Sequence, residues 1–348
     1  MDIKKTSVVS PKGDITLYTL TNASGASVTL SSLGAGIVAA VVPDSKGKMD
    51  DVVLGYGNAA DYLYDGPCAG KIPGRFANRI CDGKFVLDGQ EYQLAVNNGP
   101  NALHGGPEGF QNQIWDTVSA EDGKVVFSLF SPDGYEGYPG NMTVKATYTW
   151  NDACELELTI EAETDAATVV NLTNHVYFNL AGHVSGSMTG HKLWIKASNY
   201  LPTTEQQIPT GELAPVAGTP MDFTTPKAIG RHMYAPFEAL KIGKGYDHCW
   251  AIDGYEAGKL QHVATLSEAG SGRSVEIATT QPGIQVYGGN WLEGCPAGKD
   301  GAVYHDYSAV ALECQGFPDA PNKPGFPSPV LRPGEQYKQI IKFTFKQL

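Results

Sequence analysis

The chain has 348 residues, a formal net charge of −12 and 42% apolar residues. Its Lys and Arg residues are scattered, so there is no basic stripe that could replace counterions on phosphate, and nucleic acid is not an expected partner. The apolar content is too high for a disordered chain. The 41 glycines and 22 prolines are spread evenly along the sequence, which indicates many tight turns.

The six cysteines, at positions 68, 81, 154, 249, 295 and 314, lie far apart and form no CxxC pair. This spacing predicts neither a zinc knuckle nor a dense disulfide framework, and reduced thiols fit a cytoplasmic protein. The N-terminal segment 1–20 lacks the apolar run of a signal peptide. The sequence leaves open whether an export signal was removed before this segment. No segment reaches the ~20 apolar residues needed to span a bilayer, so we expect no membrane partner.

Three segments alternate apolar and polar residues with a period of two: 143–150, 155–162 and 341–346. This period places one set of side chains inward and the other outward on a strand. Such half-buried strands are typical of antiparallel sheets with one face on the core.

Turn signals divide the rest of the chain at short intervals. Asp-Gly pairs occur at 82–83, 88–89, 122–123, 133–134 and 253–254, and an Asn-Gly pair at 98–99, as hairpins and meanders require. Short helical turns are expected within 58–66 and 235–243, but no segment predicts a long amphipathic helix. With no linker and no repeat, the sequence predicts one large all-β domain over residues 1–348, built from packed antiparallel sheets.

Several common motifs are absent. No GxGxxG joins a strand to a helix, and there is no GxxxxGK[ST], GxSxG or HExxH, so we expect neither a nucleotide cofactor nor the commonest zinc site. Six other segments place charged or amide side chains beside glycines and aromatic rings, a mixture that suits a sugar. They are GRFANRI (74–80), NALHGG (101–106), NLTNHVYFNL (171–180), KGYDHCW (244–250), QPGIQVYGGN (281–290) and LECQGFPDAPN (312–322).

These six segments, in this order, make the chain resemble the galactose mutarotases, or aldose 1-epimerases. The resemblance extends from LGAGI (33–37) to the FPDAPN segment and the final strands. It implies a large antiparallel β-sandwich, called a supersandwich, and a cofactor-independent isomerase that interconverts the α and β anomers of free hexoses such as galactose and glucose. The resemblance thus agrees with the all-β prediction from alternation and turns.

The resemblance also implies the roles of individual residues. His175 in the NHxYFNL motif matches the family's general acid, and Glu313 in the LExQ motif matches its general base. Positions that bind sugar hydroxyls or the ring oxygen match Asn78, Arg79, His104, Asp247 and Gln285. Arg75 lies four residues before Arg79, but the motif selects the second arginine.

The chemistry requires both an acid and a base. To open a hemiacetal, a proton must leave the C1 hydroxyl while another reaches the ring oxygen. We expect Glu313 to be ionised near neutral pH with help from Arg79, and His175 to be protonated because Asp247 or Glu313 raises its pKa. The roles reverse on ring closure, so no cofactor and no metal are expected.

Each residue alone also has a structural explanation. His175 could be a core histidine, Glu313 a solvated strand end, His104 a turn residue, Asp247 a turn cap and Arg79 part of an ion pair. Two alternatives for the whole protein stay open: a carbohydrate-binding module without turnover, and a hexose-phosphate epimerase of the same fold, which would need further cations. The preferred sugar is not determined by the sequence, and the protein could be a monomer or a homodimer.

Three residues depart from the family's usual pattern. Cys314 stands where Thr is common, Phe317 where Trp is common, and Cys249 where Asn is common. A thiol is a weaker hydrogen-bond partner than a hydroxyl, so the positioning of Glu313 is the property these changes put in question.

Overall fold

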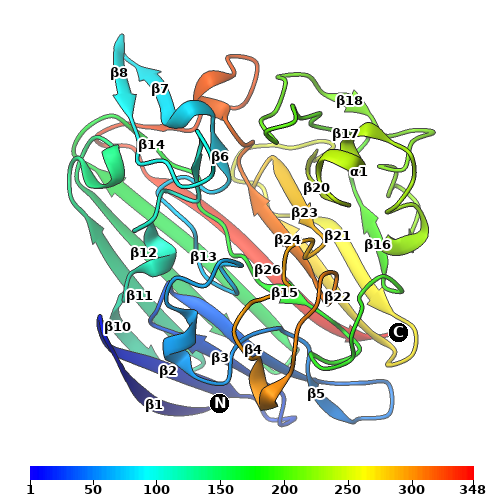
Figure 1. The fold of residues 1–348 in the computed structure, drawn as a ribbon. Coiled ribbons are helices and arrows are strands. Elements are labelled where there is room, and N and C mark those ends of the chain that lie inside the picture. The colour runs from blue at the N-terminus through cyan, green and yellow to red at the C-terminus, as the bar shows by residue number, and fades with distance from the viewer.

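The structure, a computed structural model, describes residues 1–348, and its regular secondary structure is mainly antiparallel strand (Figure 1). The largest sheet has nine strands in the order β10-β11-β12-β13-β26-β22-β21-β16-β19. Its members are β10 (Asp116–Glu121), β11 (Lys124–Ser131), β12 (Met142–Trp150), β13 (Glu155–Thr164), β16 (Lys192–Ile195), β19 (Lys227–Ala228), β21 (Gln261–Glu268), β22 (Arg273–Thr279) and β26 (Tyr337–Gln347).

Two further large sheets complete the architecture. A five-stranded sheet has β1 (Asp2–Ser10), β2 (Gly13–Thr21), β3 (Ser27–Ser31), β4 (Gly36–Pro43) and β5 (Met49–Asp51) in sequential order. A six-stranded sheet has the order β15-β24-β23-β20-β17-β18, made of β15 (Tyr177–Phe178), β17 (Asn199–Tyr200), β18 (Ala214–Pro215), β20 (Asp247–Ala251), β23 (Gly283–Tyr287) and β24 (Val310–Gln315). The expected all-β antiparallel fold is confirmed.

The remaining elements are short. Three strand pairs are β6 (Arg79–Ile80) with β9 (Ala102–Leu103), β7 (Lys84–Leu87) with β8 (Gln90–Gln93), and β14 (Thr168–Val169) with β25 (Val330–Leu331). The single α-helix is α1 (Glu238–Ile242), and the 3-10 turns are η1 (Ala59–Tyr62), η2 (Cys81–Gly83), η3 (Phe110–Asn112), η4 (Tyr135–Gly137), η5 (Ile229–Arg231), η6 (Lys299–Gly301) and η7 (Ala320–Asn322). Helical turns within 58–66 and 235–243 are therefore confirmed, and no helix has the length and apolar character to cross a bilayer.

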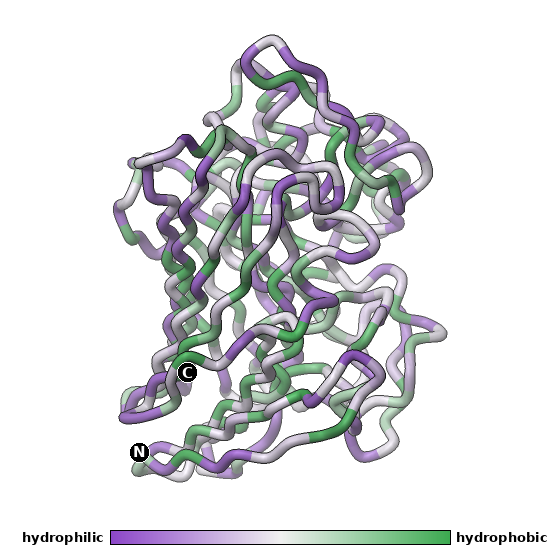
Figure 2. Tube along the Cα trace, turned by 90° about the vertical axis from the view of Figure 1, so that its left-hand side faces the viewer, coloured by the Kyte–Doolittle hydropathy of each residue, from purple (hydrophilic) through white to green (hydrophobic).

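The predicted alternation is visible along the long strands (Figure 2). In β12 every second residue from Met142 to Trp150 is buried, while Thr143, Lys145 and Thr149 are exposed. Two of the Asp-Gly pairs form tight hairpins: Asp88 and Gly89 have φ of 52° and 84° between β7 and β8, and Asp122 and Gly123 have φ of 50° and 74° between β10 and β11. Positive φ at both central residues is the type I′ geometry that matches the twist of paired strands.

The six-stranded sheet presents different residues on its two faces, and this positions the site. Trp250 of β20, Ile284 of β23 and Leu312 of β24 point into a core of 59 buried residues shared by the three large sheets. Because side chains alternate across a strand, the odd-numbered residues of these strands point to the opposite face. That face carries Asp247 and Glu313, two of the predicted site residues.

Candidate active site

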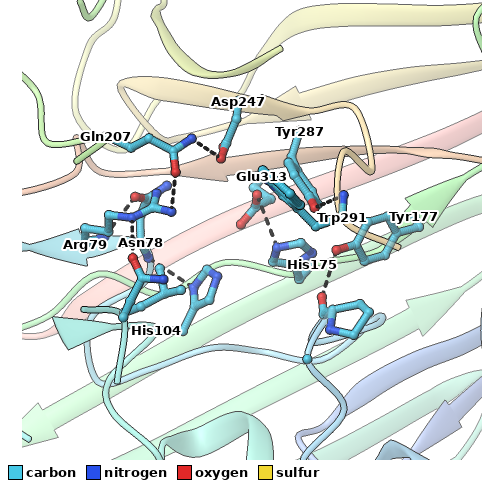
Figure 3. A pocket seen from close by; sticks show the side chains of 14 residues that line it. Asn78, Arg79, His104, His175, Tyr177, Gln207, Asp247, Tyr287, Trp291 and Glu313 are labelled. Atoms are coloured by element: carbon cyan, nitrogen blue, oxygen red, sulfur yellow. Dashed lines mark hydrogen bonds and ion pairs between the residues drawn. The ribbon is translucent and has the colours of Figure 1, made fainter. Parts of the chain in front are cut away.

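A cavity of about 440 Å³ lies over the odd-numbered face of the six-stranded sheet (Figure 3). The sheet forms its floor, and loops between strands form its walls. The lining residues are Gly66, Pro67, Asn78, Arg79, Asn98, Leu103, His104, His175, Tyr177, Gln207, Asp247, Tyr287, Trp291 and Glu313. Six of the seven predicted site residues are in this set, and Gln285 is not.

The pairing register of β20, β23 and β24 brings distant parts of the sequence together on the floor. Asp247 lies opposite Tyr287, and Gln285 lies opposite Glu313. Directly opposed residues of an antiparallel pair have Cβ atoms about 4.5–5.5 Å apart. The register therefore sets Glu313 two strands away from Asp247 on one surface.

His175 reaches the same floor from the segment just before β15. Its backbone N–H donates to the Lys71 carbonyl at 2.9 Å, and its own carbonyl accepts from Gly70 N at 2.9 Å. Asn174 adds a side-chain bond from Nδ2 to the Gly70 carbonyl at 2.7 Å. The aromatic and amide neighbours of His175 in the sequence thus fix the backbone that carries the ring, and His175 Nε2 lies 3.5 Å from Glu313 Oε1.

Both members of this pair are buried, with side chains 6% and 2% exposed for His175 and Glu313. Burial raises the pKa of Glu313 well above its usual value, more than Arg79 lowers it. Burial also lowers the pKa of His175 to about 4, more than its own carbonyl and Asp247 raise it. The expected rise in the pKa of His175 is therefore wrong, and the pKa of Glu313 is shifted toward the protonated form, because desolvation outweighs the neighbouring charges.

Asn78, Arg79 and His104 form one wall, joined by the β6–β9 pair in which Arg79 lies opposite Leu103. Asn78 and His104 both have left-handed backbones, with φ of 64° and 54°, a region sparsely populated by residues other than glycine. His104 Nδ1 accepts from Asn78 N at 3.1 Å. The proton of the neutral His104 ring is therefore on Nε2, where it can be donated.

Arg79 and Asp247 are linked by an amide side chain across the top of the cavity (Figure 3). Arg79 donates from Nη2 to Gln207 Oε1 at 2.7 Å, and from Nε to Asn98 Oδ1 at 3.0 Å. Gln207 Nε2 in turn donates to Asp247 Oδ2 at 2.8 Å. This chain holds a guanidinium donor and a carboxylate acceptor at fixed positions.

Gln285 lies behind Asp247 rather than in the cavity. Its Nε2 donates to Asp247 Oδ1 at 2.6 Å, and its side chain is buried at 3% exposure. Gln285 is not among the residues that line the cavity, so the direct contact with the sugar expected for it stays a prediction. In the structure, Gln285 orients the Asp247 carboxylate.

Eight lining residues were not predicted from the sequence: Gly66, Pro67 and Leu103, and the polar or aromatic Asn98, Tyr177, Gln207, Tyr287 and Trp291. Tyr177 and Tyr287 lie inside the predicted motifs NLTNHVYFNL and QPGIQVYGGN, and the period of two places Tyr287 on the face of Gln285. Gln207 is in a loop without a motif, so nothing in its local sequence signals the site. Trp291 is 63% exposed at the rim.

The departures from the family pattern leave the cavity intact. Cys314 points into the core on the other face of β24, and burial raises the pKa of its thiol to about 12. Cys249 is on the face of Gln285 but outside the cavity lining. Arg75 is also away from the site, where its guanidinium donates to the carbonyls of Pro139 and Gly140, as the preference for Arg79 predicted. No group of three or more His, Cys, Asp or Glu side chains is arranged to hold a metal ion.

The fold and the site together define a class: large antiparallel β proteins with an imidazole and a carboxylate in a polar cavity of sugar size. The sequence model described as aldose 1-epimerase matches residues 16–344. The chain therefore belongs to the aldose 1-epimerase family. It is an isomerase that interconverts the anomers of aldoses, as the sequence predicted.

Individual relatives agree with this assignment. The chain is 46% identical over 318 residues to the galactose mutarotase of Sus scrofa, covering 91% of this chain and 90% of that protein. It is 38% identical over 348 residues to the aldose 1-epimerase of Escherichia coli K12, covering 99% of both. The crystal structure of the GalM/aldose epimerase homologue from C. elegans superposes with a TM-score of 0.87 at 30% identity, covering 99% of this chain and 100% of that one.

Proposed function

We propose that His175 and Glu313 are the acid and the base of the epimerase, and that free galactose and glucose are its substrates. The observation that carries this proposal is the 3.5 Å separation of His175 Nε2 and Glu313 Oε1 on the floor of a polar cavity. The galactose mutarotases among the relatives support galactose as a substrate. The six cysteines, none in a disulfide, support our further proposal that the protein works in the reducing cytoplasm.

Ring opening needs one proton to leave the sugar and one to arrive. The Glu313 carboxylate takes the proton of the C1 hydroxyl, the O1 electron pair forms the C1=O1 double bond, and the C1–O5 bond breaks. The ring oxygen O5 takes a proton from the His175 imidazolium. Rotation about C1–C2 turns the other face of the aldehyde toward O5, and ring closure returns both protons, so the enzyme is regenerated without a cofactor.

The burial of the pair sets which proton forms are present before reaction. Burial favours the neutral forms, a protonated Glu313 and a neutral His175, and these two forms together hold one proton. Transfer of that proton from Glu313 to His175 produces the carboxylate and the imidazolium without changing the net charge. The two groups therefore titrate as a pair, and the reactive form is a tautomer of the singly protonated state.

The walls supply the groups that hold the sugar hydroxyls. Arg79 and His104 Nε2 offer donors, Asp247 offers an acceptor, and Asn78 has an amide at the same wall. We assign Gln285 a positioning role through Asp247. Arg79 is the one Lys or Arg that lines the cavity, and its guanidinium already donates to Asn98 and Gln207, so the site does not favour the doubly charged phosphate of a hexose phosphate.

Polarimetry tests the acid/base assignment. Freshly dissolved α-galactose should relax to equilibrium faster with the protein than without it, and Glu313→Gln should lower kcat by about 10²–10⁴-fold. Glu163→Gln, which changes an exposed carboxylate on β13, should keep the wild-type rate. Wild-type kinetics in folded Glu313→Gln would contradict the base assignment, and sugar binding without any acceleration would favour a non-catalytic module.

A further inference from the structure

The two oxygens of Glu313 have different surroundings. Oε1 faces His175 and the cavity, whereas Oε2 is buried and has no protein partner for a hydrogen bond. A buried carboxylate oxygen without a donor is costly. A site that ionises Glu313 during catalysis must therefore place a donor on the side of Oε2.

Gln315 lies on the same face of the same strand. It is two residues further along β24, so its side chain points to the same face as Glu313, and it is 0% exposed. Neither Nε2 nor Oε1 of its amide makes a hydrogen bond to a protein group. A fully buried amide with both atoms unpartnered is rare in folded proteins.

Gln285 contributes a fourth unpartnered atom, Oε1, on the same face of the sheet. It lies opposite Glu313 on β23, and Gln315 lies opposite the next odd residue of β23, Gly283. The three side chains are therefore direct or diagonal neighbours within reach of one another. Because Gln285 donates from Nε2 to Asp247, its amide orientation is fixed and its buried Oε1 is an acceptor without a donor.

The neighbouring side chains do not supply that donor. A side chain at Gly283 would meet the Cys249 sulfur at 2.7 Å and the Phe317 ring at 3.0 Å, so these two groups close the space on that side. A ring carbon donates no hydrogen bond, and a thiol is a weak donor. Three acceptors, Glu313 Oε2, Gln285 Oε1 and Gln315 Oε1, thus lack a donor on this face, and Gln315 Nε2 is an amide donor without an acceptor.

We propose that a buried water molecule beneath Glu313 is part of the active site, accepting from Gln315 Nε2 and donating to Glu313 Oε2 and to Gln285 Oε1. Water is the small molecule whose two donors and free acceptor match this set, and buried waters typically make about three hydrogen bonds. Gln315 is thereby a positioning residue, acting on the base through the water. This inference rests on the proposed role of Glu313.

The water favours the ionised form of Glu313, because a donor stabilises a carboxylate more than a carboxylic acid. It therefore opposes burial, which favours the protonated form. The titratable groups that interact with Glu313 are His175, Asp247, Arg79, Tyr177, Tyr287, Cys68, Cys249 and Cys314. Of these, Arg79 favours the carboxylate, but it is committed to Asn98 and Gln207.

The pH profile of kcat/KM for Gln315→Leu tests the proposal. Loss of the water should move the alkaline limb, which reports Glu313 in the singly protonated pair, to a pH about one unit higher. It should also reduce the plateau of kcat/KM about tenfold. The matched control is Gln339→Leu, which removes another fully buried glutamine whose Nε2 donates to the Leu172 carbonyl at 2.8 Å. This variant should be less stable than wild type, but the alkaline limb of its kcat/KM profile should stay at the wild-type pH.

A high-resolution crystal structure gives a reading that does not depend on activity. Wild type should show one ordered water bonded to Gln315, Glu313 and Gln285, and Gln315→Leu should lack it. If Gln315→Leu fails to fold, Gln315→Met, which keeps the unbranched shape, takes its place. A direct bond from Gln315 to Glu313, or an unmoved alkaline limb in a folded variant, would overturn the proposal. An inactive wild type that still holds the water would instead overturn the proposed function.

Discussion

At the scale of single residues, His104 shows how one hydrogen bond assigns a role. Its Nδ1 accepts a backbone N–H, so Nε2 is left as a donor inside the cavity. Burial is the first cause that lowers the pKa of His104 well below its usual value, followed by the positive charge of His175 when protonated. This shift favours the neutral ring, which fits the sugar-binding role proposed for His104.

This role predicts the effect of His104→Asn. Asparagine tolerates the left-handed backbone at this position, and its Oδ1 can accept from Asn78 N, but it does not replace the Nε2 donor. The loss of one hydrogen bond to the substrate should lower kcat/KM by about 10–100-fold, while thermal unfolding changes little. Steady-state polarimetry measures this, and an unchanged kcat/KM would remove His104 from the binding set.

The proposed pair of His175 and Glu313 predicts a particular pH profile. Activity needs the singly protonated pair, so kcat/KM should fall below pH ~4, where His175 and Glu313 are both protonated. It should also fall above the raised pKa of Glu313, where the pair loses its last proton. The measurement is the enzymatic rate after subtraction of the spontaneous rate at each pH. A single acidic limb near the usual carboxylate pKa would contradict this arrangement.

At the scale of elements, the sequence predicts those strands that have one face in the core. In β13 and β26, alternation follows directly from one buried and one solvated face. The six residues of β24 are all buried, because the site side is covered too, so alternation of polarity is lost there. The two-residue strand β15 is likewise too short for a periodic signal.

The same reasoning explains which site residues the sequence identifies. The motifs identified His175 and Glu313 because the residues next to them in the sequence determine the local backbone conformation that positions them. Gln207 joins the site only through tertiary contacts with Arg79 and Asp247, so no local pattern marks it. The sequence also did not predict the direction of the pKa shifts of His175 and Glu313, because desolvation depends on burial in the folded chain.

The loop between β23 and β24, residues 288–309, carries Trp291. Lys299 in this loop forms hydrogen bonds to the segment that contains β4 and β5. Lys299 Nζ donates to Asp51 Oδ2 and the Val53 carbonyl, each at 2.6 Å, and to the Val38 carbonyl at 2.9 Å. These contacts attach η6 to β4 and β5. The side chain is 16% exposed, so its bonds are largely shielded from water.

We therefore expect Lys299→Met to loosen this loop. Removing the ammonium leaves three acceptors without that donor and should cost about 1–3 kcal/mol. Hydrogen exchange in 291–305 should become faster, while β12 and β13 keep their protection. Lys259→Met, which breaks an exposed pair with Glu256 (side chains 57% and 66% exposed), is the control and should change neither. Unchanged exchange in 291–305 would contradict the fastening role.

At the scale of the whole molecule, one apolar core connects the sheets. The 59-residue cluster includes Leu20 of β2, Tyr148 of β12 and Leu312 of β24, which belong to the three large sheets. We propose on this basis that residues 1–348 form a single domain. Groups buried anywhere in this core are then linked to the stability of the entire fold, and this includes several histidines.

Acid should unfold the protein through these buried histidines. Burial lowers the pKa of His191 and of His248 to about 4, as it does for His175. Each folded-state pKa is below the unfolded value of ~6.5, so the unfolded chain binds protons first as the pH falls. The associated stability is complete above pH ~6.5 and decreases toward pH ~4, by about 1.4 kcal/mol per pH unit for each histidine.

His191→Gln isolates one of these contributions outside the active site. His191 Nε2 accepts from Leu180 N at 2.8 Å, and the amide oxygen of glutamine can accept that bond without titrating. Urea unfolding at pH 7 and pH 5 measures the difference in the free energy of unfolding. Between these pH values, the variant should lose about 2 kcal/mol less than wild type. An equal loss in both proteins would mean that His191 protonates in the folded state as readily as in the unfolded chain.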